Sequence, residues 1–207
     1  MQSTHPNEQH SQRPDFATLT GTPGHLIGLH RPLEHERGLL PVMATLHPQV
    51  DRLRQARDRI VRLRGRVEMS EAAPEELPRT REWVARETLA HIDEMVPYWL
   101  SEIERVLAGP EPVPFGRTPN DLIRLLTIDR DRTLPVGELY VRLDAGLDRV
   151  VRRLLDLDDR QCARRGLHPH RGEMTVQEIV EVMLVGHIEE HCEQLTLSLD
   201  QGIAAKA

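Results

Sequence analysis

The chain has 207 residues, of which 39% are hydrophobic and 29% are charged, so we expect one domain with a substantial core and a tail. The formal net charge of -6 argues against a nucleic-acid-binding protein, because recognition of phosphates depends on clustered positive charge. Aromatic residues make up only 3% of the chain, so Leu, Val and Ile must fill the interior. That composition favours a helical bundle over a β-sandwich.

The chain begins with a segment that carries no folding signal. Residues 1–45 are rich in Pro, Gly, His, Gln, Ser and Thr and show no sustained hydrophobic period, so we expect a flexible N-terminal arm. The folded domain is expected over residues 46–202. No segment approaches 18 consecutive apolar residues, and the first 20 residues lack the apolar core of a signal peptide. We therefore expect a cytoplasmic protein with no membrane partner.

Apolar residues at helical spacing predict two long helices in the first half of the domain. The first helix is expected to run from Pro48 to about Met69. The second is expected to start near Thr80, a suitable N-cap, and to end at Gly109. Pro97 lies inside this second helix and should kink it, because proline removes a backbone donor.

The second half of the domain is expected to begin with a long crossover connection, residues 109–134, that contains a short helix capped by Thr118. Whether this connection covers a pocket or only joins antiparallel helices is left open. A third helix is expected over residues 136–157 and a solvated loop over residues 158–174, which contains His168 and His170. The capping box Thr175-x-x-Glu178 then predicts the start of a fourth helix that ends near Gly202.

Three histidines are the candidate metal ligands. His187 and His191 lie four residues apart in the fourth helix, so their Cβ atoms are about 5–6 Å apart and the two imidazoles can share one ion. Both lie at the edge of the apolar stripe, where an unpartnered polar ring is costly. His91 has the same placement in the second helix, so the three rings converge if the two stripes face each other. Three His and an open position suit a catalytic transition metal, whereas structural zinc sites use four ligands, usually including cysteine.

This arrangement resembles the DinB/YfiT-like metalloprotein superfamily. The resemblance rests on His91, on the His187-x3-His191 pair about a hundred residues later and on Gln194 behind that pair, and it covers roughly residues 45–200. It implies an all-α four-helix bundle of the DinB/YfiT-like type that binds a divalent transition metal such as zinc or nickel. The superfamily includes thiol-dependent S-transferases and isomerases, proteins described as metal-dependent hydrolases, and many members of unknown activity that are induced under stress.

The chemistry of such a site follows from its charge. Three neutral imidazoles leave the charge of a divalent ion uncompensated, so the pKa of a bound water falls toward about 7, or a thiol binds as thiolate. We therefore expect an enzyme that acts on a small-molecule substrate, either as a hydrolase or as an S-transferase or isomerase with a low-molecular-weight thiol. The alternative is a non-catalytic, stress-related bundle or dimerisation module whose metal is structural or absent. Both hypotheses allow a homodimer.

Four further residues are candidates for the site. Glu94 follows the expected ligand of the second helix by three residues, and Glu190 lies between the two expected ligands of the fourth. Each can orient a ligand or act as an acid or base, with a surface or ion-pair role as the alternative. Tyr98 and Glu87 lie near the same line on the second helix and are candidates for the pocket wall and for cofactor binding.

Overall fold

The structure, a computed structural model, describes residues 46–70 and 84–204, with side chains as far as Gln201. The predicted N-terminal arm, residues 1–45, lies outside the described residues. Within the described part of the chain, no helix is both long enough and apolar enough to span a bilayer.

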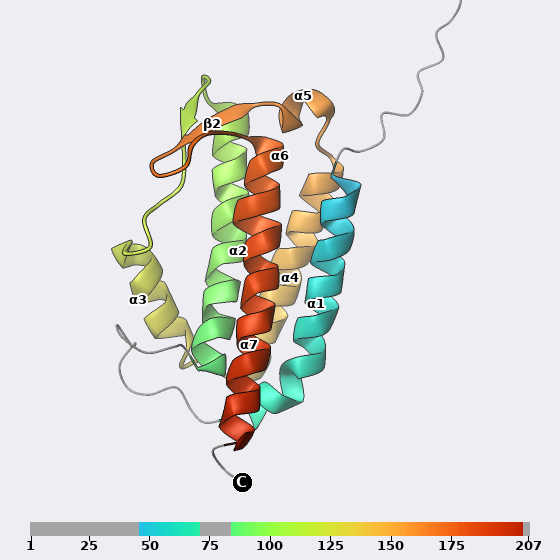
Figure 1. Cartoon of the computed structure of the whole chain (residues 1–207), viewed down its shortest axis with the longest axis vertical. Helices are drawn as coiled ribbons and strands as arrows, with labels where there is room; N and C mark the ends of the chain where they lie inside the picture. The colour runs from blue at the N-terminus through green and yellow to red at the C-terminus, as the bar shows by residue number, and fades with distance from the viewer. Residues whose placement is uncertain (1–45, 71–83, 205–207) are drawn as a thin grey trace, which may run out of the picture. The chain divides into compact units, whose positions relative to one another are not determined.

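Four long helical segments lie side by side and form the predicted four-helix bundle (Figure 1). α1 and α2 each pack against both α4 and α7, so α1 and α2 occupy diagonal corners of the bundle although they follow each other in sequence. The predicted all-α bundle is therefore confirmed. The bounds of these segments are α1 His47–Glu68, α2 Ala85–Ala108, α4 Val136–Leu155, and a last continuous segment made of α6 Val176–Glu178, the π-helix η1 Ile179–Gly186 and α7 His187–Ala204.

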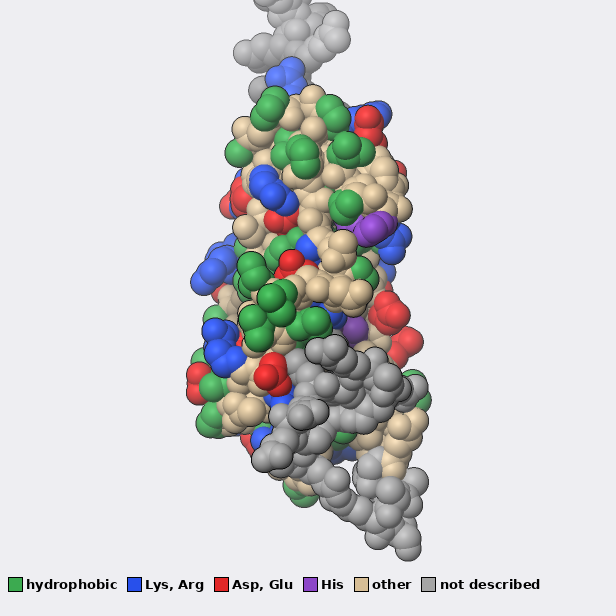
Figure 2. All heavy atoms as spheres, turned by 90° about the vertical axis from the view of Figure 1, so that its left-hand side faces the viewer, with side chains coloured by type: hydrophobic (Ala, Val, Ile, Leu, Met, Phe, Trp, Pro, Cys, Tyr) green, Lys and Arg blue, Asp and Glu red, His purple; other side chains and the backbone are tan. Residues whose placement is uncertain are grey.

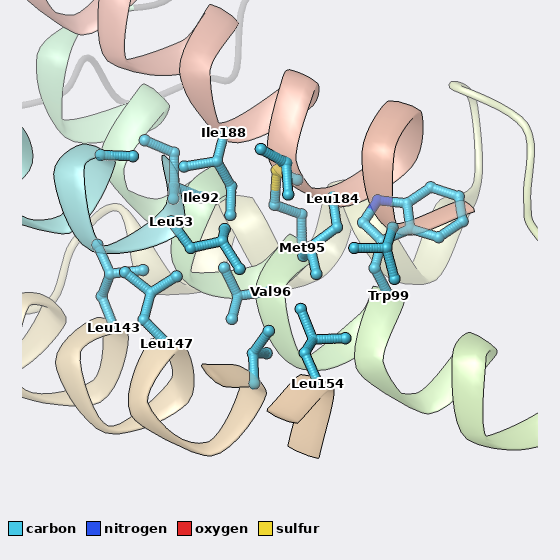
Figure 3. Packing of buried hydrophobic residues seen from close by; sticks show 14 of the residues in the cluster. Leu53, Ile92, Met95, Val96, Trp99, Leu143, Leu147, Leu154, Leu184 and Ile188 are labelled. Atoms are coloured by element: carbon cyan, nitrogen blue, oxygen red, sulfur yellow. The ribbon is translucent and has the colours of Figure 1, made fainter. Parts of the chain in front are cut away.

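The core between the four segments is almost entirely aliphatic, as the scarcity of aromatic residues predicts. Each segment contributes fully buried side chains, and Figure 3 shows several of them in contact. Burial of this apolar surface is the main force that holds the helices together. The buried residues drawn in the figure include Leu53 from α1, Val96 and Trp99 from α2, Leu143 and Leu147 from α4, and Leu184 and Ile188 from the last segment.

The starts of α1 and α4 agree with the predicted starts to within one residue. The capping box at Thr175 is confirmed, because its hydroxyl accepts a hydrogen bond from the Glu178 amide. α2 begins at Ala85 with Val84 as N-cap, later than the predicted start near Thr80, which lies outside the described residues. The predicted cap at Thr118 is wrong. The short helix α3 (Leu122–Asp131) is capped by Asp121, whose carboxylate accepts from the Arg124 amide at 2.8 Å.

The long crossover connection is confirmed, and α3 packs along the outside of α2 (Figure 1). The far end of α3 is fixed by an ion-pair network. The Arg142 guanidinium lies 2.8 Å from the Asp131 carboxylate and 2.7 Å from that of Asp93, and both carboxylates are buried. This network fastens α3 to α2 and α4.

The expectation of a plain loop over residues 158–174 is wrong. This stretch contains the short helix α5 (Asp159–Cys162) and the strands β2 (Arg165–His168) and β3 (Gly172–Thr175). The strands form a sheet in the order β1-β2-β3, in which β1 (Val113–Pro114) pairs parallel to β2 and β3 pairs antiparallel to it. The strands have two to four residues, too few for a hydrophobic period to be recognised. The sheet ties the crossover connection to the segment before α6.

Candidate metal centre

The three predicted ligands come together between α2 and α7. One nitrogen from each of His91, His187 and His191 lies within 4.8 Å of the others. The ring centroids of His91 and His187 are each 4.6 Å from that of His191, and they are 5.6 Å from each other. Small side-chain rotations allow one ion to be shared, because a metal–nitrogen bond is about 2.1 Å long. The rings thus converge as the hypothesis requires, while metal binding itself stays a prediction.

The segment that presents His187 is a π-helix, which the sequence analysis missed. Residues 179–186 form η1, and α7 begins at His187. A π-helix places more residues in each turn than an α-helix, so it changes the direction of the side chains that follow, and such segments are frequent at functional sites. Within η1, a Cβ atom on Gly186 would lie 3.2 Å from the carbonyl oxygen of Glu181. A glycine therefore suits this tightly packed turn, and it is the one local signal of the π segment.

Hydrogen bonds with neighbouring groups orient the rings of His187 and His191 and determine which ring nitrogen carries the proton. The His191 Nδ1 lies 2.8 Å from the Gln194 side-chain oxygen, so Nδ1 carries the proton and Nε2 is left with its lone pair. A second hydrogen bond joins the His187 ring to the Met183 carbonyl. The His191 Nε2 is buried, and no hydrogen-bond partner for it exists among the described residues. Because a buried acceptor without a partner is costly, a metal ion fits this position.

Polar side chains surround the buried ring of His91. Its Nδ1 lies 3.6 Å from a Glu94 carboxylate oxygen, and its Nε2 lies 3.4 Å from a terminal nitrogen of Arg124. The two Glu94 oxygens in turn accept from Arg117 at 2.6 and 2.7 Å. The Arg117 guanidinium stacks 3.7 Å from the centre of the Tyr98 ring. Glu94 is therefore held beside a candidate ligand.

The three imidazoles are neutral at pH 7. Burial lowers the pKa of His91 well below its ordinary value, and the nearby His191 and Arg124 further disfavour its protonated form. Burial lowers the pKa of His187 to about 4 and also lowers the pKa of His191. The neutral ring is the form that coordinates a metal, so the site is prepared for binding.

A cavity of about 530 Å³ opens next to the cluster. His91 and His187 form part of its wall, so a molecule inside it can reach the site. Histidine and basic side chains reach the surface on the side of the molecule that carries α3 (Figure 2). The other residues that line the cavity are apolar (Met95, Trp99, Met183, Pro119), basic (Arg117, Arg124, Arg171), imidazole-bearing (His168, His170) or hydroxyl-bearing (Thr118).

The remaining predicted residues have different surroundings. Glu87 is fully buried, accepts from the Val84 amide at 3.0 Å and lies 3.7 Å from Arg132, so it fastens the start of α2. Glu190 is exposed on α7. Tyr98 is half-buried, and burial raises its pKa to about 12, so its hydroxyl stays protonated at pH 7. Roles for these residues in binding or catalysis stay predictions.

The sequence analysis missed the arginines of the cavity and the position of His168. His168 was expected in a solvated loop, but it is buried on β2 and lines the cavity, whereas His170 is exposed. Its burial depends on a close approach by Gly116, which has a φ of 87° and where a Cβ atom would collide with the His168 ring. The signal available in the sequence was Gly116 itself, a glycine that follows Phe115 in a long connection and allows another side chain to approach closely.

Fold and site together define a four-helix bundle with three clustered histidines beside an open cavity. The chain belongs to the DinB superfamily, whose family model matches residues 50–195. The structure is similar to that of YfiT from Bacillus subtilis, which is described as a probable metal-dependent hydrolase with an unusual four-helix bundle topology. The TM-score is 0.61, the sequences are 18% identical, and the match covers 84% of this chain and 94% of that one. No curated protein matches the chain.

The lowered pKa of His187 predicts a pH-dependent stability. The unfolded ring takes up a proton near pH 6.5, whereas the folded ring does so only near pH 4. Between these values the unfolded state binds more protons, so the free energy of unfolding falls as the pH falls. Urea denaturation of metal-free protein at pH 7 and pH 4.5 should show a smaller loss in His187→Gln than in the unmodified chain. Equal losses would show that His187 is not titrated by unfolding.

Proposed function

We propose that this protein is a metal-dependent hydrolase, which binds one divalent transition metal through His91, His187 and His191 and acts on a small-molecule substrate. The observation that carries the proposal is the convergence of three neutral imidazoles, one buried and two half-buried, next to an open cavity. The description of YfiT as a probable metal-dependent hydrolase supports the same chemistry.

The donor set suits a catalytic ion better than a structural one. Within the described residues the cluster has three members, all of them imidazoles. Structural zinc sites have four protein ligands, whereas catalytic sites keep a position open for water or substrate. Neutral imidazoles suit zinc and nickel, and we propose one of these two as the native metal.

When bound, the ion supplies Lewis acidity, which lowers the pKa of a coordinated water or thiol. The chain supplies orientation and access. Gln194 and the Met183 carbonyl fix the rings of His191 and His187, and Glu94, held by Arg117, faces the ring of His91. Such partners of ligating histidines set the direction and the basicity of the ring.

Among the acid–base candidates, the surroundings favour Glu94. It is almost fully buried next to His91, where it can orient that ligand and exchange a proton with its ring. Tyr98 acts on the site through Arg117, which stacks on its ring. Glu190 is retained as the weaker acid–base candidate because it is exposed.

The second candidate function is transfer or isomerisation with a low-molecular-weight thiol. It is supported by the same open ligand position and by a cavity large enough for a cofactor as well as a substrate. A cobalt-substituted protein separates these enzymes from a non-catalytic bundle. Its absorption spectrum should change when cysteine or acetohydroxamate is added. An unchanged spectrum would indicate a closed, structural site.

Metal binding should depend on each of the three histidines. Replacement of His91, His187 or His191 by Ala should weaken zinc or nickel binding at least about tenfold, because even partners of ligands contribute that much. His47→Ala is the matched control, since His47 is exposed on α1. The measurement is metal content by mass spectrometry in untagged protein after loading and desalting. Full metal content in His91→Ala would contradict this ligand set, and metal-free unmodified protein would remove the enzyme proposal.

The two glutamates should differ in their effect on the metal. Glu94→Gln should lower zinc affinity about 10- to 100-fold, because the carboxylate that faces His91 and anchors Arg117 is lost. Glu190→Gln makes the same chemical change at an exposed position and should stay within about twofold of the unmodified protein. Competition with a chromogenic zinc chelator measures both affinities. A larger loss of zinc affinity in Glu190→Gln than in Glu94→Gln would assign the supporting role to Glu190.

A further inference from the structure

The wall of the cavity is positively charged before any metal binds. Three arginines, Arg117, Arg124 and Arg171, line it together with four histidines, and no Asp or Glu is among the lining residues that the structure describes. The proposed divalent ion would add two further charges. A wall with this balance of charge favours an anionic ligand.

Arg117 and Arg124 have different roles in that wall. The charge of Arg117 is balanced by Glu94, with which it makes a two-point ion pair, and its guanidinium is stacked on Tyr98. Arg124 donates to the Pro119 carbonyl at 2.9 Å and lies 3.4 Å from the His91 Nε2.

Arg124 lies on α3, and this helix is held in place at both of its ends. The backbone amide of Arg124 donates to the Asp121 cap, and the other end of the helix is held by Asp131 in its ion pair with Arg142. The guanidinium is therefore placed next to the histidine cluster by the backbone. An anionic group that binds Arg124 would lie beside the position of the proposed metal.

His168 provides a second, independent indication of a ligand. Its Nδ1 accepts a hydrogen bond from the His170 amide, so the neutral ring carries its proton on Nε2. His168 is 5% exposed and lines the cavity, and its Nε2 has no hydrogen-bond partner among the described residues. A buried donor without an acceptor is costly, and an oxygen of a bound anion would satisfy it.

Apolar side chains complete the cavity. Met95, Trp99 and Met183 line it together with the basic residues, so part of a ligand can be removed from water there. Inorganic anions gain nothing from such contacts. The lining therefore suits a small organic molecule that combines an apolar body with an anionic group.

We propose that the cavity binds an organic carboxylate, whose charged group pairs with Arg124 and whose apolar body contacts Met95, Trp99 and Met183. The assignment of this carboxylate as the substrate rests on the proposed hydrolase function. Binding of the anion is independent of that function, because Arg124, His168 and the apolar wall are present without metal. The two claims can therefore fail separately.

The probe is benzoate, with benzamide as its neutral analogue, and binding is measured by isothermal titration calorimetry on metal-free, full-length protein. Benzoate should bind more tightly than benzamide. Arg124→Gln should weaken benzoate binding at least about tenfold and leave benzamide unchanged, because a charge-assisted pair is lost. Arg54→Gln removes the same charge from an exposed position on α1 and should have no effect.

Arg124→Lys guards against loss of the fold. It keeps the charge but not the planar fork, so its affinity for benzoate should lie between those of the unmodified protein and Arg124→Gln. Equal binding of benzoate and benzamide, or an unchanged affinity in Arg124→Gln, would overturn the proposal. Arg124-dependent benzoate binding in a protein that takes up no zinc would support the anion site and remove the hydrolase. Zinc uptake without a preference for benzoate over benzamide would overturn the anion site and leave the proposed hydrolase standing.

Discussion

The contact between α2 and α7 is the constraint on which the site depends. It places His91 against His187 and His191 in the interior of the bundle, where burial disfavours the charged form of every ring. The rings are therefore neutral at pH 7, and the buried Nε2 of His191 has no hydrogen-bond partner among the described residues. A divalent ion would provide that partner and could be shared by the three rings. The packing that stabilises the bundle thus also prepares the ligands that a metal needs.

The remainder of the site is built from elements outside the four long helices. The crossover connection contributes Arg117 and Arg124, and α3 is anchored by the buried carboxylate of Asp131. The small sheet brings His168 into the cavity wall, although β1 and β2 are separated by all of α3 and α4. The long helices hold the histidine cluster in place. The connections determine which molecules can reach it and with which charge, as is common for functional loops on a rigid scaffold.

The parts of the molecule that local patterns encode were predictable. Helical periodicity gave the four long segments to within a few residues, and the hydroxyl–carboxylate pairing at Thr175 gave the start of α6. The histidine triad was found because three polar rings lie beside apolar stripes. Non-local features were missed: the strands are too short to show a period, and the π-helix differs from an α-helix only in its turn-by-turn geometry. Arg124 was not identified from the sequence, because its place beside His91 depends on how α3 packs.

The most direct measurement of the central claim is an anomalous-difference map from crystals of zinc-loaded protein, recorded above the zinc absorption edge. The account predicts one strong peak per chain between α2 and α7, in bonding contact with nitrogens of His91, His187 and His191 and with a fourth position left to solvent or an added ligand. A peak held by other residues, or no peak at this cluster, would contradict it.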